Sequence, residues 1–435
     1  MQPPGRELPP SSSSSPRPPL PSKRPFYSQR IRLITSEDDS GGETNGSVAL
    51  VSPLENDDLV ADSLLFLPAL PSSLLRASLV CKRWCRVLSN PRFLRDFRAH
   101  HGNPPLLGLF YCNWGRIIFT PMLDPPDEIP PRHFALGVAA GARLLSCNHG
   151  RVLIHNEVER HFLVWDPVTG ELRCIPTPPS FRPNIMFSID GAVVCASTDQ
   201  GHVHGACHSD PFRIVVVAGD GDRFYGCAYS SETKAWGNLF SVMRPPHLRK
   251  VRAPTCSKVF WNSIFSLIVW GKLVIVEFDW ARQNLALIDA PYELGFYDFI
   301  GDRCQFLIKQ SDGCGLSFIV QEAFTVRVWK RRLDGDGVAT WILSNTIDMN
   351  SLLSLGLPAD SWVRLLILAL DDDGNVLFKM FNSRVVFTVN LESREFKKLP
   401  KTYPFVVGHP FSSFYTPGMH IKSGRADEAQ NILGV

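Results

Sequence analysis

The sequence of 435 residues lacks the features that would place the chain in a membrane or outside the cell. Its longest apolar run, residues 264–278, is interrupted by Lys272 and Glu277 and is too short to cross a bilayer. The first residues contain no apolar signal core. The net charge of +3 gives no reason to expect bulk binding to nucleic acid or to membranes. We therefore expect a soluble intracellular protein of the nucleus or the cytoplasm.

Catalytic motifs and paired cysteines are also missing. The eleven cysteines are an odd number, and none forms a C-x-x-C pair, which favours free thiols in a reducing compartment. The sequence has no G-x-S-x-G elbow, no P-loop and no G-x-G-x-x-G fingerprint. These absences argue against an enzyme of those classes and give no reason to expect a cofactor.

One loop contains several residue types that bind zinc. His202, His204, Cys207 and His208 offer four ligands within seven residues. A stable zinc site usually takes ligand pairs from two separated elements, and no second cluster lies nearby in the sequence. We therefore expect no metal site.

Residues 371–375 resemble the start of a calcium loop, but the required Gly and Glu are replaced by Val376 and Asn382, so we interpret these residues as a hairpin turn.

Helical patterning is present in residues 57–100. Residues 72–88 contain no Gly or Pro, and Ser72 or Ser73 can cap the first N–H groups, so the sequence predicts one helix over 72–88. At 100° per residue, one arc of roughly 160° collects apolar side chains. We expect that arc to be the core: Leu74, Ala77, Val80, Cys81, Trp84, Cys85, Val87 and Leu88.

A second face of the same helix combines two leucines with two cations. Leu75, Leu79, Lys82 and Arg86 follow one another at helical spacing, away from the core arc. This pattern fits a docking surface for an acidic, partly apolar partner. It fits equally well two leucines that the rest of the chain covers.

Two shorter helices are predicted on either side. Residues 56–67 have acids in the first turn and are stopped by Pro68, and Asn90 and Pro91 begin a third helix. Three short helices bury little surface alone, so we expect a partner or a neighbouring domain to complete them.

These helical residues resemble an F-box, most of all those of a large family of plant F-box proteins. The resemblance lies in residues 57–62 (DDLVAD), 74–84 (LLRASLVCKRW) and 90–94 (NPRFL), while Glu55, Asn56 and Ser63 depart from the usual pattern. The resemblance implies docking onto the Skp-type adaptor of a cullin–RING ubiquitin ligase. The residues implied in that contact are Leu59, Leu64, Leu67, Leu75, Leu79, Lys82 and Arg86.

After residue 103 the pattern changes to short β-branched and aromatic runs separated by Gly, Asp, Asn and Pro turns. A strand–turn–strand unit recurs roughly every 50 to 65 residues, which in an all-β chain predicts a propeller of kelch-like blades. We expect each turn to join the two outer strands of a blade, and a sixth blade to combine residues 106–121 with residues 405–415. The units are residues 164–176 (VWDPVTGELRCIP), 228–236, 277–288, 328–343 and 388–400.

The sequence thus predicts an α+β multidomain chain, with a small three-helix F-box followed by an all-β propeller of about six blades. The predicted boundaries are a disordered tail at 1–50, the F-box at 53–101, the propeller at 105–418 and a flexible tail at 419–435. The plant F-box family shows the same propeller body.

The resemblance implies a substrate-recruiting, non-catalytic subunit of a Skp–cullin–F-box ubiquitin ligase. Its partners would be the Skp-type adaptor, through it the cullin and RING subunits, and a client protein that the sequence does not name. Two alternatives remain open. One is a propeller enzyme, which would need convergent ionisable residues in a central pocket; the other is a scaffold that binds the adaptor without turning over a client.

Overall fold

The residues that the computed structural model describes lie between positions 56 and 415, within the unit Ser52–Val435. The predicted tails at 1–50 and 419–435 lie outside the described residues. The described residues are 56–113, 116–139, 141–181, 188–197, 202–220, 222–244, 254–260, 263–270, 272–293, 304–311, 315–333, 338–356, 365–371, 373–380, 385–399 and 408–415.

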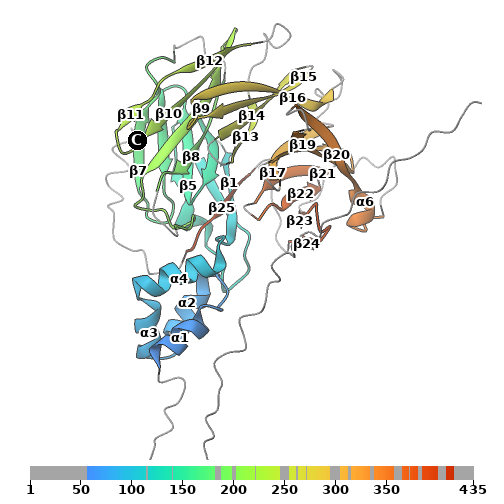
Figure 1. Cartoon of the computed structure of the whole chain (residues 1–435). Coiled ribbons are helices and arrows are strands. Elements are labelled where there is room, and N and C mark those ends of the chain that lie inside the picture. Colours follow the sequence, from blue (N-terminus) through green and yellow to red (C-terminus); the bar gives the residue numbers. More distant parts are fainter. Residues whose placement is uncertain are drawn as a thin grey trace, which may run out of the picture. The chain divides into compact units, whose positions relative to one another are not determined.

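The first part of the described chain is a helical module (Figure 1). It consists of α1 (Asp57–Leu64), α2 (Pro71–Ser78), α3 (Lys82–Leu88) and α4 (Pro91–His101). Asn56 caps α1, and Asn90 caps α4 with Pro91 at its first position, as the sequence predicts. The module's core cluster consists of Val60, Leu64, Leu74, Ala77, Val87, Leu88, Phe93 and Phe97.

The prediction of one helix over residues 72–88 is wrong, because the chain leaves helical geometry after Ser78. The N–H groups of Leu79 and Val80 bond to carbonyls three residues back, which tightens the end of α2. Cys81 is extended, and its sulfur accepts the N–H of Trp84 at 3.4 Å, so Cys81 caps a new helix. The module therefore has four helices instead of three.

Packing gives the physical reason for this break. A straight helix over 72–88 would be about 26 Å long and could not place both of its ends on one small core. The break lets Leu74 of α2 and Leu88 of α3 contact the same cluster. The predicted capping is corrected too, since α2 begins at Pro71 and neither Ser72 nor Ser73 is its N-cap.

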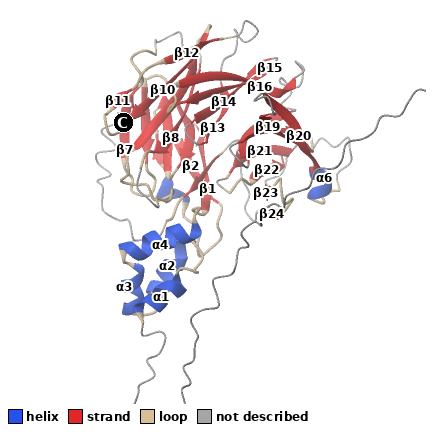
Figure 2. Cartoon of the chain, viewed as in Figure 1, coloured by secondary structure: helices blue, strands red, loops and turns tan. Residues whose placement is uncertain are grey.

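Strands make up nearly all the regular structure after the helical module (Figure 2). They form six antiparallel sheets, which we call blades 1 to 6 in chain order. Blade 1 contains β25 (His409–Ser412), β1 (Leu106–Asn113), β2 (Arg116–Pro121) and β3 (Leu136–Gly137). Blade 2 contains β4 (Ala142–Asn148), β5 (Arg151–Asn156), β6 (His161–Trp165) and β7 (Leu172–Pro176). Blade 3 contains β8 (Ser188–Cys195), β9 (Phe212–Gly219), β10 (Arg223–Ser230), β11 (Ala235–Trp236) and β12 (Phe240–Met243).

The remaining blades have four strands each. Blade 4 contains β13 (Pro254–Phe260), β14 (Ser263–Trp270), β15 (Lys272–Asp279) and β16 (Asn284–Glu293). Blade 5 contains β17 (Cys304–Ser311), β18 (Gly315–Glu322), β19 (Thr325–Leu333) and β20 (Ala339–Asp348). Blade 6 contains β21 (Leu365–Leu370), β22 (Val376–Met380), β23 (Val386–Val389) and β24 (Phe396–Lys398). Two short helices, η2 (Pro131–Phe134) and α6 (Met349–Leu352), accompany blades 1 and 5.

The blades close into a ring through their innermost strands. These contact one another in the order β4, β8, β13, β17, β21, β25 and back to β4. Blade 1 joins the two ends of the domain, because β25 pairs with β1 in the register Phe110↔His409 and Gly108↔Phe411. The predicted six-bladed propeller and its mixed closing blade are confirmed.

The predicted repeat also appears as a repeated turn between the two outer strands of a blade. The side chain of the first turn residue accepts N–H groups from the residues two and three positions later, and the residue four positions later has a positive φ. This holds for Asp166 and Gly170, Asp279 and Gln283, and Asn390 and Arg394. Such side chains mimic a backbone turn, which is why Asp and Asn recur there.

The described residues contain no helix long and apolar enough to span a membrane. The cysteines whose side chains are described, Cys195 and Cys207 among them, are free thiols.

Candidate functional site

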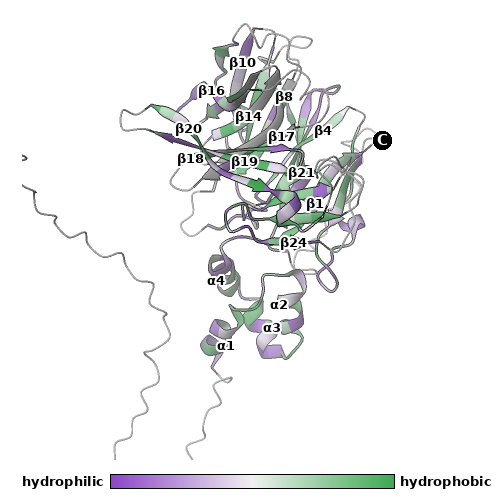
Figure 3. Cartoon of the chain, turned by 90° about the vertical axis from the view of Figure 1, so that its right-hand side faces the viewer, coloured by the Kyte–Doolittle hydropathy of each residue, from purple (hydrophilic) through white to green (hydrophobic). Residues whose placement is uncertain are grey.

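The helical module exposes a row of apolar side chains next to the break between α2 and α3. Leu79 is 77% exposed and Val80 is 62% exposed, and Leu75 of α2 is also exposed. Figure 3 shows hydrophobic and hydrophilic segments side by side in these helices. Burial of such exposed apolar side chains by a partner would lower the free energy, so they form a possible binding surface.

Cations border this apolar row on α3. Lys82 and Arg86 are exposed, as predicted. Arg86 Nη2 lies 3.1 Å from Asp57 Oδ2, and Arg83 also bonds to Asp57, so both arginines tie α3 to the first turn of α1. The hydrogen bond from Arg83 is the main cause that holds the pKa of Asp57 below its usual value. Part of the charge of Arg86 is thus already paired inside the module.

The predicted contact residues of α1 are divided between surface and core. Leu59 is 48% exposed, whereas Leu67 is half-buried. Leu64 is only 3% exposed and belongs to the core cluster, so its side chain cannot lie on a contact surface. The reason is the helical period: Val60 and Leu64, four residues apart, lie on the same inward face.

The predicted core of α2 and α3 is also corrected in part. Leu74 and Leu88 are buried, and Trp84 is half-buried against the cluster. Val80, Cys81 and Cys85 are exposed and are not core residues. Val80 and Cys81 lie at the break, and Cys85 lies on α3 beyond it, where the helical wheel of one continuous helix no longer applies.

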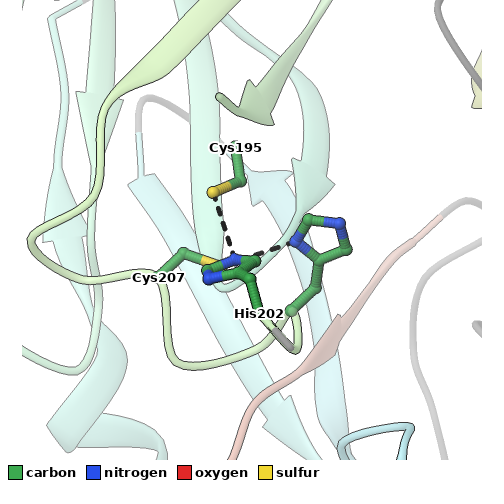
Figure 4. Close-up of side chains that lie close together, drawn as sticks. Cys195, His202 and Cys207 are labelled. Atoms are coloured by element: carbon green, nitrogen blue, oxygen red, sulfur yellow. Dashed lines mark hydrogen bonds between the residues drawn. The ribbon is translucent and has the colours of Figure 1, made fainter. Parts of the chain in front are cut away.

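Four metal-binding side chains meet on the propeller, at the loop between β8 and β9. Cys195 at the end of β8 joins His202, His204 and Cys207, and their ligand atoms all lie within 4.8 Å of one another. Figure 4 shows the sulfur of Cys195 facing the ring of His202, with Cys207 beside it. The sequence shows no second ligand cluster beside this loop, but the fold adds one ligand from another element, since β8 supplies Cys195.

His208, the other predicted ligand of this loop, has a different partner. Its Nδ1 lies 2.7 Å from Asp166 Oδ2, in the outer turn of blade 2. Asp166 is buried, and burial is the largest single influence and opposes its ionisation. The interaction with His208 and the N–H groups of Thr169 and Val168 together outweigh it, so the pKa of Asp166 is lowered. His208 thus connects two blades and is outside the four-residue cluster.

A cavity of about 280 Å³ lies between blades 3 and 4. Among the described residues, its lining is mostly apolar and contains one ionisable side chain, Arg213. A lone arginine provides no acid–base pair for catalysis. The lining residues are Arg213, Ala228, Gly237, Asn238, Phe240, Phe278, Trp280, Ala281 and Gln283.

Curated proteins of Arabidopsis thaliana are similar to this chain. An F-box/kelch-repeat protein is 25% identical over 167 residues, an F-box protein is 21% identical over 320 residues, and a further F-box/kelch-repeat protein is 25% identical over 250 residues. The chain is a homologue of plant F-box proteins. The resemblance noted in the sequence is confirmed.

Each match covers part of this chain and part of the relative. The matches span 37%, 69% and 53% of this chain, and 40%, 70% and 57% of the relatives, in the same order. No protein-family model matches the chain.

Solved structures similar to this chain include two lyases. A virginiamycin B lyase from Staphylococcus aureus has a TM-score of 0.35 at 8% identity and covers 69% of this chain and 87% of its own. A streptogramin B lyase has a TM-score of 0.33 at 12% identity and covers 67% of this chain and 74% of its own.

Sequence reasoning missed two exposed apolar residues of the helical module. Phe66 follows α1, is 64% exposed and has its ring edge-on to His100 at 5.0 Å. Val80 was assigned to the core by the helical wheel. The length of the apolar run 64–67, which exceeds what one short helix can bury, is the signal that could have identified Phe66.

Proposed function

We propose that this chain is the substrate-recruiting subunit of a Skp–cullin–F-box ubiquitin ligase. The proposal is supported above all by the homology with plant F-box proteins. The exposed apolar residues Leu75, Leu79 and Val80 beside Lys82 support it further, because they offer an adaptor both apolar area and positive charge.

In this proposal the chain performs no covalent chemistry. The helical module binds the Skp-type adaptor, which connects it to the cullin and RING subunits, while the propeller holds a client protein. Catalysis comes from proximity, since the client is held near a conjugating enzyme that another subunit carries. Such a complex would work in the nucleus or the cytoplasm.

The test is adaptor binding by the double variant Leu75→Asp and Leu79→Asp in the full chain. Each leucine should contribute roughly 1.5–3 kcal/mol if the adaptor buries it fully. We therefore expect the double variant to lose co-purification with a Skp-type adaptor while the propeller stays folded by circular dichroism. Leu333→Asp, at an exposed leucine of β19, is the matched control and should bind as the wild type does.

Adaptor binding that is equal in the double variant and in the wild type would remove this face from the proposal. The scaffold alternative needs a second readout. A reconstituted ligase that contains the chain should transfer ubiquitin to proteins captured by the propeller. Adaptor binding without any such transfer would favour the scaffold.

A further inference from the structure

We propose that Cys195, His202, His204 and Cys207 bind a structural Zn²⁺ ion. The residue types are those of a Cys₂His₂ site, one of the ligand sets of closed, structural zinc sites. The ion would connect the end of β8 to the loop that leads into β9. This site is independent of the proposed adaptor contact.

The distances between the ligand atoms match a tetrahedron around zinc. With Zn–S near 2.3 Å and Zn–N near 2.05 Å, a tetrahedral sulfur–nitrogen edge is about 3.6 Å. The sulfur of Cys195 lies 3.4 Å from His202 Nε2, and the sulfur of Cys207 lies 3.3 Å from the same atom. The sulfur of Cys207 also lies 3.6 Å from His204 Nδ1. These three edges thus lie within about 0.3 Å of the tetrahedral length, and all four ligand atoms lie within 4.8 Å of one another.

The charges of the site balance. Cysteine binds zinc as a thiolate and histidine binds it as a neutral ring, so two of each cancel the charge of the ion. A neutral site suits this position, because Cys207 is buried and Cys195 and His202 are half-buried. The exposed side chain of His204 leaves a side from which the ion can enter.

Residues around the cluster orient the two histidines. His202 turns its Nε2 to the sulfurs, and its Nδ1 lies 3.7 Å from Asp210 Oδ2. A carboxylate behind the second nitrogen of a zinc-binding histidine is the usual arrangement, since it sets the tautomer. The ring of His204 is stacked on His149 at 3.7 Å, and His149 Nδ1 accepts the N–H of Cys195 at 2.9 Å.

The backbone of the loop is held in place by the propeller itself. Arg151 is buried, and its guanidinium donates to the carbonyls of Cys207 and Asp210. The carbonyl of Gly205 accepts the hydroxyl of Ser413 at 2.8 Å and the N–H of Phe414 at 3.0 Å. These contacts arrange the ligands in advance, which lowers the entropy lost when a metal binds.

The same contacts give the ion a structural role. Gly205 lies against Pro104, just before β1, and is bonded to the residues just after β25. The loop therefore contacts the residues just before β1 and the residues just after β25, the two strands that close the ring. A zinc ion that fixes the loop would hold these segments together.

The experiment measures zinc in the full chain, purified under reducing conditions. We expect about one Zn²⁺ per chain by mass spectrometry of metals. Cobalt added to the chelator-treated protein should give the visible bands of tetrahedral Co²⁺ and a thiolate charge-transfer band. X-ray absorption should show two sulfur ligands near 2.3 Å and two nitrogen ligands near 2.0 Å.

Single variants identify the ligands. Cys195→Ser and Cys207→Ser should each lose the bound zinc and weaken the charge-transfer band, while Cys174→Ser, at an exposed cysteine of β7, should keep both. Asp210→Asn should weaken zinc affinity about 10- to 100-fold. Chelation should speed proteolysis of the wild type but not of Cys195→Ser.

Three results would overturn the proposal. One is a wild-type chain that shows no thiolate–cobalt band, a result that does not depend on how any variant folds. Another is unchanged zinc affinity in Cys195→Ser. The third is a Cys195–Cys207 disulfide found under the same reducing conditions. None of these results bears on adaptor binding by Leu75 and Leu79, so the proposed function is tested separately.

Discussion

Strand β5 contains two buried ionisable side chains, and each meets the cost of burial in its own way. The guanidinium of Arg151 donates to the loop carbonyls of Cys207 and Asp210, because a buried polar group needs hydrogen-bond partners. His155 is 2% exposed and packs its ring on Phe162, with 4.7 Å between ring centroids. Burial favours the neutral form of an imidazole, and for His155 this effect is larger than the attraction of the Glu157 carboxylate.

His155 should make the stability of the propeller depend on pH. Burial lowers its pKa from 6.5 to about 4. Between these values the unfolded chain binds a proton that the folded chain does not, so stability falls as the pH falls from about 6.5 to 4. The loss should approach about 3 kcal/mol below pH 4. We expect the free energy of unfolding, measured with denaturant at several pH values, to fall less steeply with decreasing pH in His155→Leu than in the wild type.

The control for this prediction is His133→Leu, at an exposed histidine of η2, which should keep the wild-type slope. If His155→Leu and the wild type lose stability in parallel between pH 6.5 and 4, His155 is not the group responsible.

At the scale of the element, the break between α2 and α3 decides which side chains are core and which are surface. Leu88 is fully buried, whereas Val80, which a continuous helix would have buried, is 62% exposed. Two short helices can each turn one face to the cluster, and the residues between them are left outside. The same break produces the exposed apolar row that the proposed function uses.

A pair of alanine substitutions tests this division. Leu88→Ala should destabilise the helical module by about 2–5 kcal/mol, because it leaves a cavity in a small core. Val80→Ala should change stability by about 0.5 kcal/mol or less, because the side chain is largely solvated. Hydrogen exchange of the amides in α1 to α4, measured in the full chain, reports the opening of the module separately from the propeller. Equal losses of protection in the two variants would mean that α2 and α3 form one helix in solution.

At the scale of the molecule, ring closure depends on the pairing of β1 with β25, residues about 300 positions apart in the chain. Phe411 of β25 is buried among Phe110, Phe119 and Phe134, with ring centroids 5.1 to 6.3 Å away. Closure removes the free sheet edge that β1 would otherwise expose.

Two truncations should therefore behave differently. Deleting residues 402–435 removes β25, leaves β1 unpaired and empties an aromatic core site that alone is worth about 3–5 kcal/mol. Deleting only residues 419–435 keeps the whole of β25. We expect the first deletion to lower soluble yield and protease resistance sharply and the second to leave both near wild type. Identical behaviour of the two truncated chains would show that β25 does not close the ring.

The fold was accessible to sequence reasoning because its evidence is local and repeated. Turns such as Asp166–Gly170 and Asn390–Arg394 are stabilised by hydrogen bonds from their own side chains. Their residue pattern can therefore be recognised in the sequence, and its spacing predicts the blades without knowledge of how the blades pack. The F-box resemblance is local in the same way, since residues 74–84 and 90–94 form a continuous pattern.

The sequence by itself determined the two modules, the repeated blade unit and the resemblance to plant F-box proteins, because each depends on residues close together in the chain. Only the tertiary structure decided that α2 ends before Cys81, since that break depends on a core shared with α1 and α4. Only the tertiary structure placed Cys195 beside His202 and turned His208 away to Asp166. Distances between side chains on a strand, a loop and a neighbouring blade are set by how the blades pack, and no spacing in the sequence encodes them.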